Sequence, residues 1–277
     1  MNTSSSHLEH MLLEQICEAW HQLQQEQPLV HIMTNVVASN YVANVLLAAN
    51  ASPAMIDNPY EAESFINIAA ALSLNLGTPT SEQVEAMQIA ARTAHSLGKP
   101  WVLDPVGYGS VLHWRSAVVD QLINDQPTIL RGNASEIGSM AGKKTESKGV
   151  GSTVDSAEVY LQAQCLLEQT PCIAISGESD YIISRDYPVL QVLGGSYLQP
   201  RVTATGCALG ALIAAYSAVA APVIAALAAH VHFSIAGQRA FQTSRQLGHF
   251  NVAFLNEIHQ LNIDSMSQQA NFKILHP

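Results

Sequence analysis

The sequence is poor in basic residues. Lys and Arg number 12 against 22 Asp and Glu, and the formal net charge is −10 at pH 7. The few basic residues form no cluster, so the chain lacks the positive patch with which proteins bind nucleic acid or acidic membranes. These two classes of partner are therefore not expected, and small molecules remain as the expected ligands.

Cysteine is also scarce, and its spacing excludes two further classes of protein. The four cysteines are Cys17, Cys165, Cys172 and Cys207, and none forms a C-x-x-C pair. Neither a zinc site nor a disulfide scaffold is therefore indicated. The first ten residues, MNTSSSHLEH, have no basic region followed by an apolar core, so we expect no secretory signal. Together these absences predict a reduced, cytoplasmic protein.

One segment without charge tests that prediction. Ala208 to Ala229 is long enough to span a bilayer. However, it is mostly alanine, Pro222 lies in its middle, and His230 and His232 follow directly. Because proline breaks a helix and alanine inserts poorly into membranes, the segment predicts a pair of buried helices broken at Pro222.

Apolar runs rich in β-branched residues alternate with helical patterns along the chain. The predicted strands are Leu29–Thr34, Trp101–Asp104, Thr128–Arg131 and Cys172–Ser176, and the predicted helices are Val36–Ala49, Ser81–Leu97, Val111–Asn124 and Asp155–Glu168. This alternation predicts one α/β domain over residues 1–277, with a mainly parallel central sheet and helices on both faces.

Three further segments carry local signals. Tyr181–Ser184 and Val189–Leu193 flank a turn sequence and predict a hairpin. Lys143–Gly151 is polar and contains glycine, so we expect an exposed loop there. Residues 1–7 and the chain from about Asn262 have weak periodicity, and we expect both ends to be loosely held.

Polar residues and glycines gather where the predicted strands end. Ligands of open α/β sheets lie beyond the carboxyl ends of the strands, so these positions predict a site. They are Thr34-Asn35, Asn75–Thr78, Asp104–Gly107, Arg131–Asn133 and Ser176–Glu178.

Two carboxylates are of interest here: Asp104 ends one predicted strand, and Glu136 lies in the helix start that follows another. Asp104 and Glu136 could together hold Mg²⁺ and its waters over a phosphate group. The alternative is structural: an aspartate before a proline often forms a turn, and Glu136, three residues after Asn133, completes a capping box.

The segment RVTATGCALG, residues 201–210, runs into a predicted buried helix. The start of a helix offers unpaired N–H groups and a positive dipole end, which suit an anion and lower the pKa of a thiol. We therefore expect an anion site here and a readily ionised Cys207. The alternative is an N-capping threonine followed by a small buried cysteine.

Taken together, the motifs resemble those of a known family. They are Met33–Asn35, Ser52–Met55, Asn75–Thr78, Asp104–Gly107, Arg131–Glu136, Ser176–Glu178 and Thr203–Cys207. Their joint occurrence, in order from about Pro28 to about Glu257, closely resembles the hydroxyethylthiazole kinase family of thiamine salvage, which has the ribokinase-like fold.

The resemblance implies an enzyme that phosphorylates the hydroxyl group of 4-methyl-5-(2-hydroxyethyl)thiazole with ATP and Mg²⁺. It also implies a homotrimer in which each active site lies between two protomers. By motif match, the thiazole pocket would be lined by Asn35, Met55 and Ala204. Arg131 and Ser176 would contact ATP, and Asp104 and Glu136 would organise magnesium. The catalytic anion hole would consist of Thr205, Gly206 and Cys207.

The chain departs from the family at two positions. Ala204 replaces the first glycine of the usual Gly-Thr-Gly-Cys, and its methyl group is expected to narrow the pocket or restrict the backbone. Ser176 stands where threonine is common, which preserves the hydroxyl group.

At Cys207, many ribokinase-like enzymes have an aspartate instead. A thiol, whose ordinary pKa is about 8.5, is a poorer base near neutrality. It would act either as a thiolate or as a group that orients the substrate hydroxyl.

Two alternatives to the kinase remain at this point. The same fold serves ATP- or ADP-dependent dehydratases that repair hydrated nicotinamide nucleotides, although these usually keep an aspartate at the position of Cys207. The other alternative is a non-catalytic regulator that binds a thiazole or a nucleotide.

Overall fold

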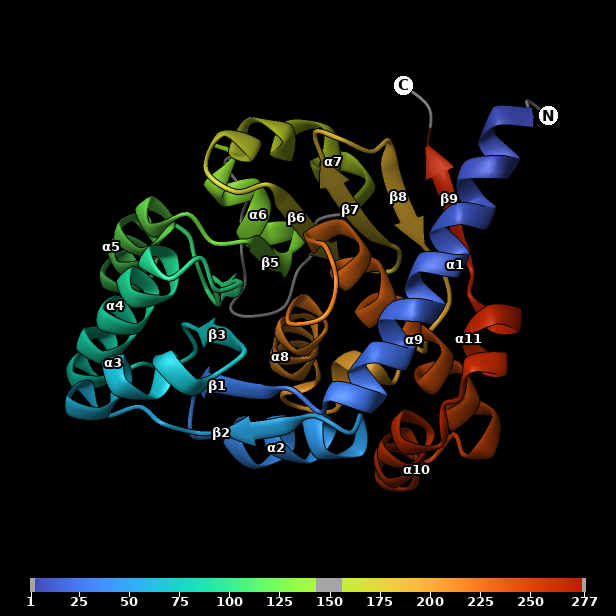
Figure 1. Cartoon of the computed structure of the whole chain (residues 1–277), viewed down its shortest axis with the longest axis horizontal. Coiled ribbons are helices and arrows are strands. Elements are labelled where there is room, and N and C mark those ends of the chain that lie inside the picture. Colours follow the sequence, from blue (N-terminus) through green and yellow to red (C-terminus); the bar gives the residue numbers. More distant parts are fainter. Residues whose placement is uncertain (1–2, 143–155, 276–277) are drawn as a thin grey trace.

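The computed structural model describes residues 3–142 and 156–275, and the predicted loop Lys143–Gly151 lies outside the described residues. A nine-stranded sheet in the order β2-β1-β3-β4-β5-β6-β7-β8-β9 forms its centre (Figure 1). The strands are β1 (Leu29–Met33), β2 (Ser52–Ala54), β3 (Ala71–Asn75), β4 (Trp101–Asp104), β5 (Ile129–Asn133), β6 (Cys172–Ser176), β7 (Asp180–Ser184), β8 (Val189–Val192) and β9 (Phe272–Leu275).

Strands β1 to β6 pair in parallel, whereas β7, β8 and β9 add antiparallel pairs at one side of the sheet. This confirms the predicted α/β class and the mainly parallel sheet. The predicted hairpin is also confirmed, since β7 and β8 pair antiparallel.

Helices cover both faces, as predicted. One face packs against α1 (Thr3–Glu26), α2 (Ser39–Ala48), α8 (Thr205–Ser217), α9 (Pro222–Thr243), α10 (Leu247–Gln260) and α11 (Ile263–Gln269). The other packs against α3 (Pro59–Ile68), α4 (Ser81–Ser96), α5 (His113–Leu122), α6 (Ala134–Met140) and α7 (Ser156–Ala163). Short 3₁₀ turns lie at Ile123–Asp125, Gln164–Glu168 and Gln199–Arg201.

The alternation of side chains along the strands divides the interior into two cores. In β3, Leu72 and Leu74 face the helices of the α3–α7 side, whereas Ala71 faces the α8–α9 side. Ser73 and Asn75 continue the Ala71 row and are buried. The polar end of this row therefore faces the layer to which α8 belongs.

The charge-free segment forms two helices, as predicted. Helix α8 ends at Ser217, and α9 begins with Pro222 in its first turn, where proline loses no hydrogen bond. Within the described residues, no helix is long and apolar enough to cross a membrane.

Helix α9 also carries a buried histidine, His232, whose two ring nitrogens both have hydrogen-bond partners while the ring is neutral. His232 Nδ1 lies 2.9 Å from Tyr216 Oη, and its Nε2 lies 3.0 Å from the carbonyl oxygen of Ile258. Burial lowers the pKa of His232 to about 4, so the ring is neutral and joins α8, α9 and α10.

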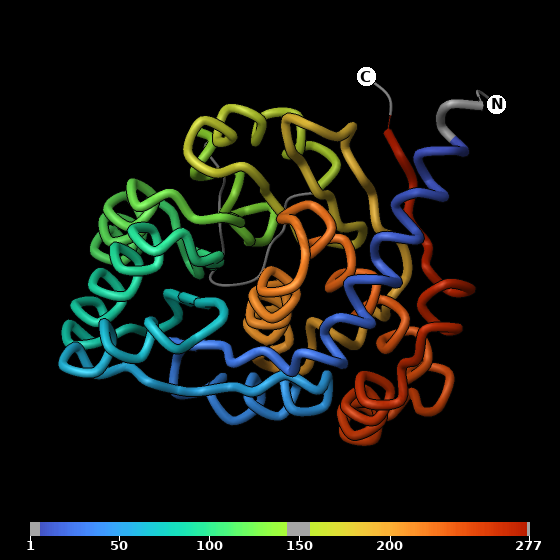
Figure 2. Tube along the Cα trace, in the orientation of Figure 1, coloured from blue at the N-terminus to red at the C-terminus, as the bar shows by residue number. Residues whose placement is uncertain are grey.

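The two ends of the chain differ from the expectation of loosely held segments. Helix α1 runs from Thr3, and its apolar residues Leu12, Ile16 and Leu23 are fully buried. After Asn262 the chain forms α11 and then β9, which pairs with β8 and lies beside α1 (Figure 2). A four-residue strand has little periodicity of its own, so its pairing depends on a partner distant in sequence.

Candidate active site

The register of the sheet places three polar residues side by side. Asn75 at the end of β3 is paired with Asp104 at the end of β4. Leu103 pairs with Leu130, so Asp104 and Arg131 are neighbours one step further along. Parallel strands end at the same edge of a sheet, and that edge is where ligands of such folds bind.

Asp104 and Arg131 form a buried ion pair. Arg131 Nη1 donates to Asp104 Oδ2 over 3.1 Å, and its Nη2 donates to Ser176 Oγ over 2.8 Å. Burial raises the pKa of Asp104, although Arg131 and the hydrogen bond from Asn75 oppose the rise. The other carboxylate oxygen, Oδ1, is buried and has no hydrogen-bond partner.

Glu136 lies in the first turn of α6 and completes a capping box. Its Oε2 accepts from the Asn133 N–H at 2.9 Å, and Asn133 Oδ1 accepts from the Glu136 N–H at 3.0 Å. The capping alternative is therefore confirmed. In addition, Oε1 accepts from the Gly107 N–H at 2.9 Å, which ties the turn after β4 to α6. Burial, and then the charge of Asp104, raise the pKa of Glu136 to about 7.

The donor set fits Mg²⁺ that shares its coordination sphere with a substrate. The described residues contain no group of three or more His, Cys, Asp or Glu side chains that could hold a metal ion. Mg²⁺ is commonly bound by one or two carboxylates, waters and substrate phosphates rather than by a protein cage. The unpartnered Oδ1 of Asp104 is an oxygen of the required kind.

Helix α8 begins with a backbone conformation that is unusual for alanine. Ala204 occupies the N-cap position at φ 69° and ψ −2°, and no side chain caps the helix. Thr205 Oγ1 donates to the Val202 carbonyl at 2.7 Å, so the alternative of an N-capping threonine is wrong. Gly206 and Cys207 lie in the first turn, where helical N–H groups have no intrahelical acceptor.

Two glycines on one side of α8 bring the helix close to the ion pair. A Cβ at Gly206 would lie 3.4 Å from the Arg131 guanidinium, and one at Gly210 would lie 3.4 Å from Asp104 Oδ2. The start of the helix therefore lies directly above the polar strand ends.

Cys207 is half-buried beside this row. Asn35 Nδ2 donates to its Sγ over 3.7 Å. Burial raises the pKa of the thiol to about 11, and the Asp104 carboxylate adds to the rise, while Arg131 opposes it. The expectation of a readily ionised thiol is thus wrong. Desolvation and a nearby negative charge outweigh the helix start, so Cys207 carries its proton at neutral pH.

Two of the three residues predicted to line the thiazole pocket, Asn35 and Met55, follow different strands. Asn35, which follows β1, is buried and bonded to Asn75 at 3.2 Å. Met55 follows β2 at the edge of the sheet and packs, half-buried, against the core on the α8 side.

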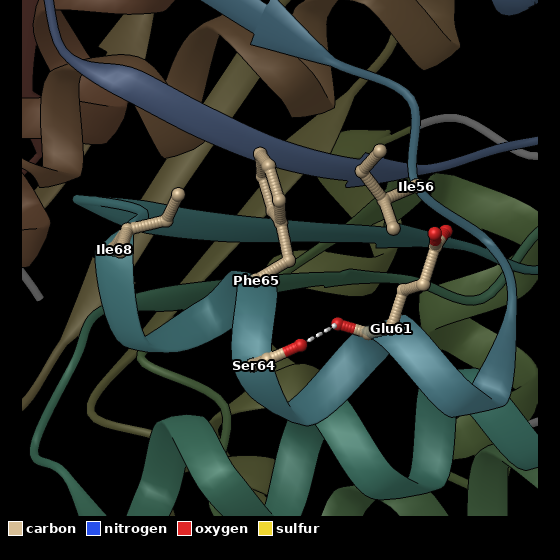
Figure 3. A pocket seen from close by; sticks show the side chains of 5 residues that line it. All are labelled: Ile56, Glu61, Ser64, Phe65 and Ile68. Carbon is tan, nitrogen blue, oxygen red and sulfur yellow. Dashed lines mark hydrogen bonds between the residues drawn. The ribbon is translucent and has the colours of Figure 1, made fainter.

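A separate pocket lies on the opposite face of the sheet. It has a volume of about 320 Å³ and is lined by Ile56, Glu61, Ser64, Phe65 and Ile68 (Figure 3). Four of these five side chains come from α3, on the side away from α8. None belongs to the row of strand ends, so we do not assign the pocket to the site.

Sequence reasoning left Asn75 without a role of its own. Its amide joins Asn35 to Asp104, because Oδ1 accepts from Asn35 at 3.2 Å and Nδ2 donates to Asp104 Oδ2 at 2.9 Å. The signal available was its position within a polar strand end, but the order of strands was not known.

Comparison with known proteins decides the family. Residues 20–264 match the hydroxyethylthiazole kinase family. A hydroxyethylthiazole kinase of Acinetobacter baumannii strain ACICU is 60% identical over 265 residues, which cover 95% of this chain and 96% of that protein. The chain belongs to the hydroxyethylthiazole kinase family.

Solved structures agree with this family assignment. A hydroxyethylthiazole kinase protein from Pyrococcus horikoshii OT3 superposes with a TM-score of 0.85 at 32% identity, covering 94% of this chain and 99% of that one. Pyridoxal kinase from Staphylococcus aureus, solved with AMP-PCP and pyridoxal, gives a TM-score of 0.57 at 15% identity, covering 76% and 87%. This second likeness extends to the fold alone, which is the ribokinase-like fold of the hydroxyethylthiazole kinase family.

The left-handed conformation of Ala204 predicts that glycine, the usual residue of the family, stabilises the protein here. Ala204→Gly should raise the free energy of unfolding by about 1 kcal/mol, because it removes the strain of a Cβ at positive φ. Ala208→Gly, one turn later at a buried helical position, should lower it by about 1 kcal/mol or more. Denaturant unfolding of both variants measures the difference. A destabilised Ala204→Gly would show that the alanine methyl makes packing contacts worth more than the strain.

Proposed function

We propose that this chain transfers the γ-phosphoryl group of ATP to the hydroxyl group of 4-methyl-5-(2-hydroxyethyl)thiazole, giving the thiazole phosphate and ADP. It is thus a phosphotransferase with an alcohol as acceptor, acting in the thiamine pathway. The observation that carries the proposal is the start of α8, with its N–H donors, above the buried pair of Asp104 and Arg131.

Phosphoryl transfer requires positioning and charge stabilisation more than covalent chemistry from the protein. In the proposal, the N–H groups of Gly206 and Cys207 bind the moving phosphoryl group, as oxyanion donors do in other enzymes. Thr205 shapes this turn through its bond to Val202. Arg131 and Ser176, which are bonded to each other, contact the nucleotide.

Asp104 and Glu136 would hold Mg²⁺, Asp104 through its unpartnered Oδ1 and Glu136 through bound water, since backbone N–H groups already occupy both Glu136 oxygens. When bound, the ion would neutralise charge on the phosphates. Burial and the neighbouring Asp104 carboxylate raise the pKa of Glu136 to about 7, although Arg131 opposes the rise.

Cys207 orients the acceptor hydroxyl in this proposal. Because Asn35 donates to the sulfur, the S–H proton is free to point elsewhere. A protonated thiol is a poor base, and a loose transition state does not require early removal of the alcohol proton. Asn35, Met55 and Ala204 are the proposed lining of the thiazole pocket.

The direct test is the release of ADP. Purified protein should release ADP only with both Mg²⁺ and the thiazole alcohol. Glu136→Gln should require roughly tenfold more Mg²⁺ for half-maximal rate, because a carboxylate that orders the ion's waters is lost.

Two results of that assay would contradict the proposal. ADP release without any alcohol would indicate a nucleotide hydrolase, and release only with hydrated nicotinamide nucleotide would indicate the dehydratase. An unchanged magnesium titration for Glu136→Gln would remove Glu136 from the metal site.

The raised pKa of Cys207 predicts a pH profile without a thiol. Because the pKa is raised to about 11, the group is protonated throughout pH 6–9 and its charge does not change there. Cys207→Ser, which keeps the shape, should retain the wild-type pH dependence of kcat and lose less than about tenfold in rate. A rising limb present in the wild type and absent from the serine variant would instead make Cys207 a base.

The proposed assembly is a homotrimer with active sites at the interfaces. Support comes from the family resemblance and from exposed apolar side chains at the site. Val36 and Val37, which follow Asn35, are 83% and 61% exposed. Exposed apolar groups at such a position favour coverage by another protein surface. Asn35 and Cys207 lie 3.7 Å apart within one chain, so both belong to the same part of a shared site.

A charge on this surface should dissolve the assembly. Val37→Asp should shift the mass measured by light scattering from three chains towards one and reduce thiazole-dependent activity at least tenfold, since burying an unpaired carboxylate is costly. Leu161→Asp on α7 is the matched control. Leu161 is 63% exposed, as Val37 is to a similar degree, and it lies on a different helix, away from the turn that carries Val37. A wild-type mass near one chain, or equal behaviour of the two variants, would contradict the shared site.

A further inference from the structure

We propose that Asn75 is a positioning residue that holds the thiazole side and the magnesium side of the site in one fixed arrangement. This inference rests on the proposed function. Asn75 is 2% exposed and contacts Asn35 on one side and Asp104 on the other.

The orientation of the Asn75 amide is fixed by the backbone. The Gly77 N–H donates to Oδ1 over 3.1 Å, and an N–H can donate only to the amide oxygen. The NH₂ group must therefore face Asp104, where it donates to Oδ2 over 2.9 Å.

The Asn35 amide is fixed in the same way. The Ala38 N–H donates to Asn35 Oδ1 over 3.0 Å, which turns Nδ2 towards Asn75 Oδ1 and Cys207 Sγ. The result is a row of hydrogen bonds with one direction: Asn35 donates to Asn75, and Asn75 donates to Asp104. If either amide flipped, its NH₂ group would face a backbone N–H donor and its oxygen would face another oxygen.

The backbone after β3 is shaped around this row. A Cβ at Gly77 would overlap Asn35 Nδ2 and would lie 2.9 Å from Asn75 Oδ1. The two amides thus have no space to shift towards this turn. A buried amide costs free energy unless it is hydrogen-bonded. Breaking one hydrogen bond of the row would therefore leave several buried polar groups without partners, so we expect the row to form as a unit.

The two arms of Asn75 can be separated by substitution. Asn75→Asp keeps an oxygen for Gly77 and Asn35 but places a second oxygen against Asp104. Asn75→Ala removes both arms. Ser73→Ala is the matched control, because Ser73 is 3% exposed and lies two residues earlier on the same side of β3.

The test is to measure the steady-state kinetics of thiazole-dependent ADP release for each variant. Asn75→Asp should keep the KM for the thiazole alcohol within about threefold and lower kcat roughly 30-fold, because only the Asp104 arm is broken. Asn75→Ala should raise that KM about tenfold and lower kcat as well. Ser73→Ala should match the wild type in both constants. If Asn75→Ala does not fold, the isosteric Asn75→Asp carries the test.

A double-mutant cycle shows whether Asn75 acts through Asn35. Because the two amides are hydrogen-bonded, the losses in kcat/KM of Asn35→Ala and Asn75→Ala should be non-additive. The kcat/KM of the double variant should lie within about threefold of that of the less active single variant. Losses that multiply, or Asn75 variants that match Ser73→Ala, would overturn the positioning role alone. A wild type without thiazole-dependent activity would overturn the proposed function and this inference with it.

Discussion

The buried pair of Asp104 and Arg131 is the interaction on which the rest of the site depends. Removing one partner of such a pair leaves an uncompensated charge, which typically costs about 3–5 kcal/mol. The surrounding features accommodate the pair: Asn75 and Ser176 hydrogen-bond to it, and glycines let α8 approach it. A strong electrostatic interaction and the candidate chemistry therefore occupy the same strand ends.

This arrangement also explains the protonation states around it. The pair and the groups around it are buried or half-buried, and burial disfavours the negatively charged form of a neighbouring carboxyl or thiol group. The pKa of Glu136 rises to about 7 and that of Cys207 to about 11, with burial the largest cause for each and Asp104 the next. A thiol with so high a pKa supplies almost no thiolate near neutral pH.

The sequence predicted the fold where local signals were strong. Residues Trp101–Asp104 and Cys172–Ser176 form strands with the predicted bounds, and Pro222 separates two helices as expected. Strand β9 and the row through Asn75 were not predictable locally, because both depend on partners distant in sequence.

The ionisation of Cys207 shows a different limit of prediction. A helix start is visible in the sequence, and it favours the thiolate. The depth of burial and the nearness of Asp104 are properties of the folded chain, and they act in the opposite direction. Likewise, the capping box at Glu136 was recognisable from spacing, whereas its bond to Gly107 was not.

The edge strand β2 has a consequence for how copies of this chain can associate. It is only three residues long, and its central residue is Pro53, which has no N–H to donate. Short edge strands and prolines are two of the features by which proteins make a sheet edge a poor template for pairing with another chain. The β2 edge is thus a poor template for strand exchange and fibrillar growth, which favours contacts through side chains where another molecule meets this side.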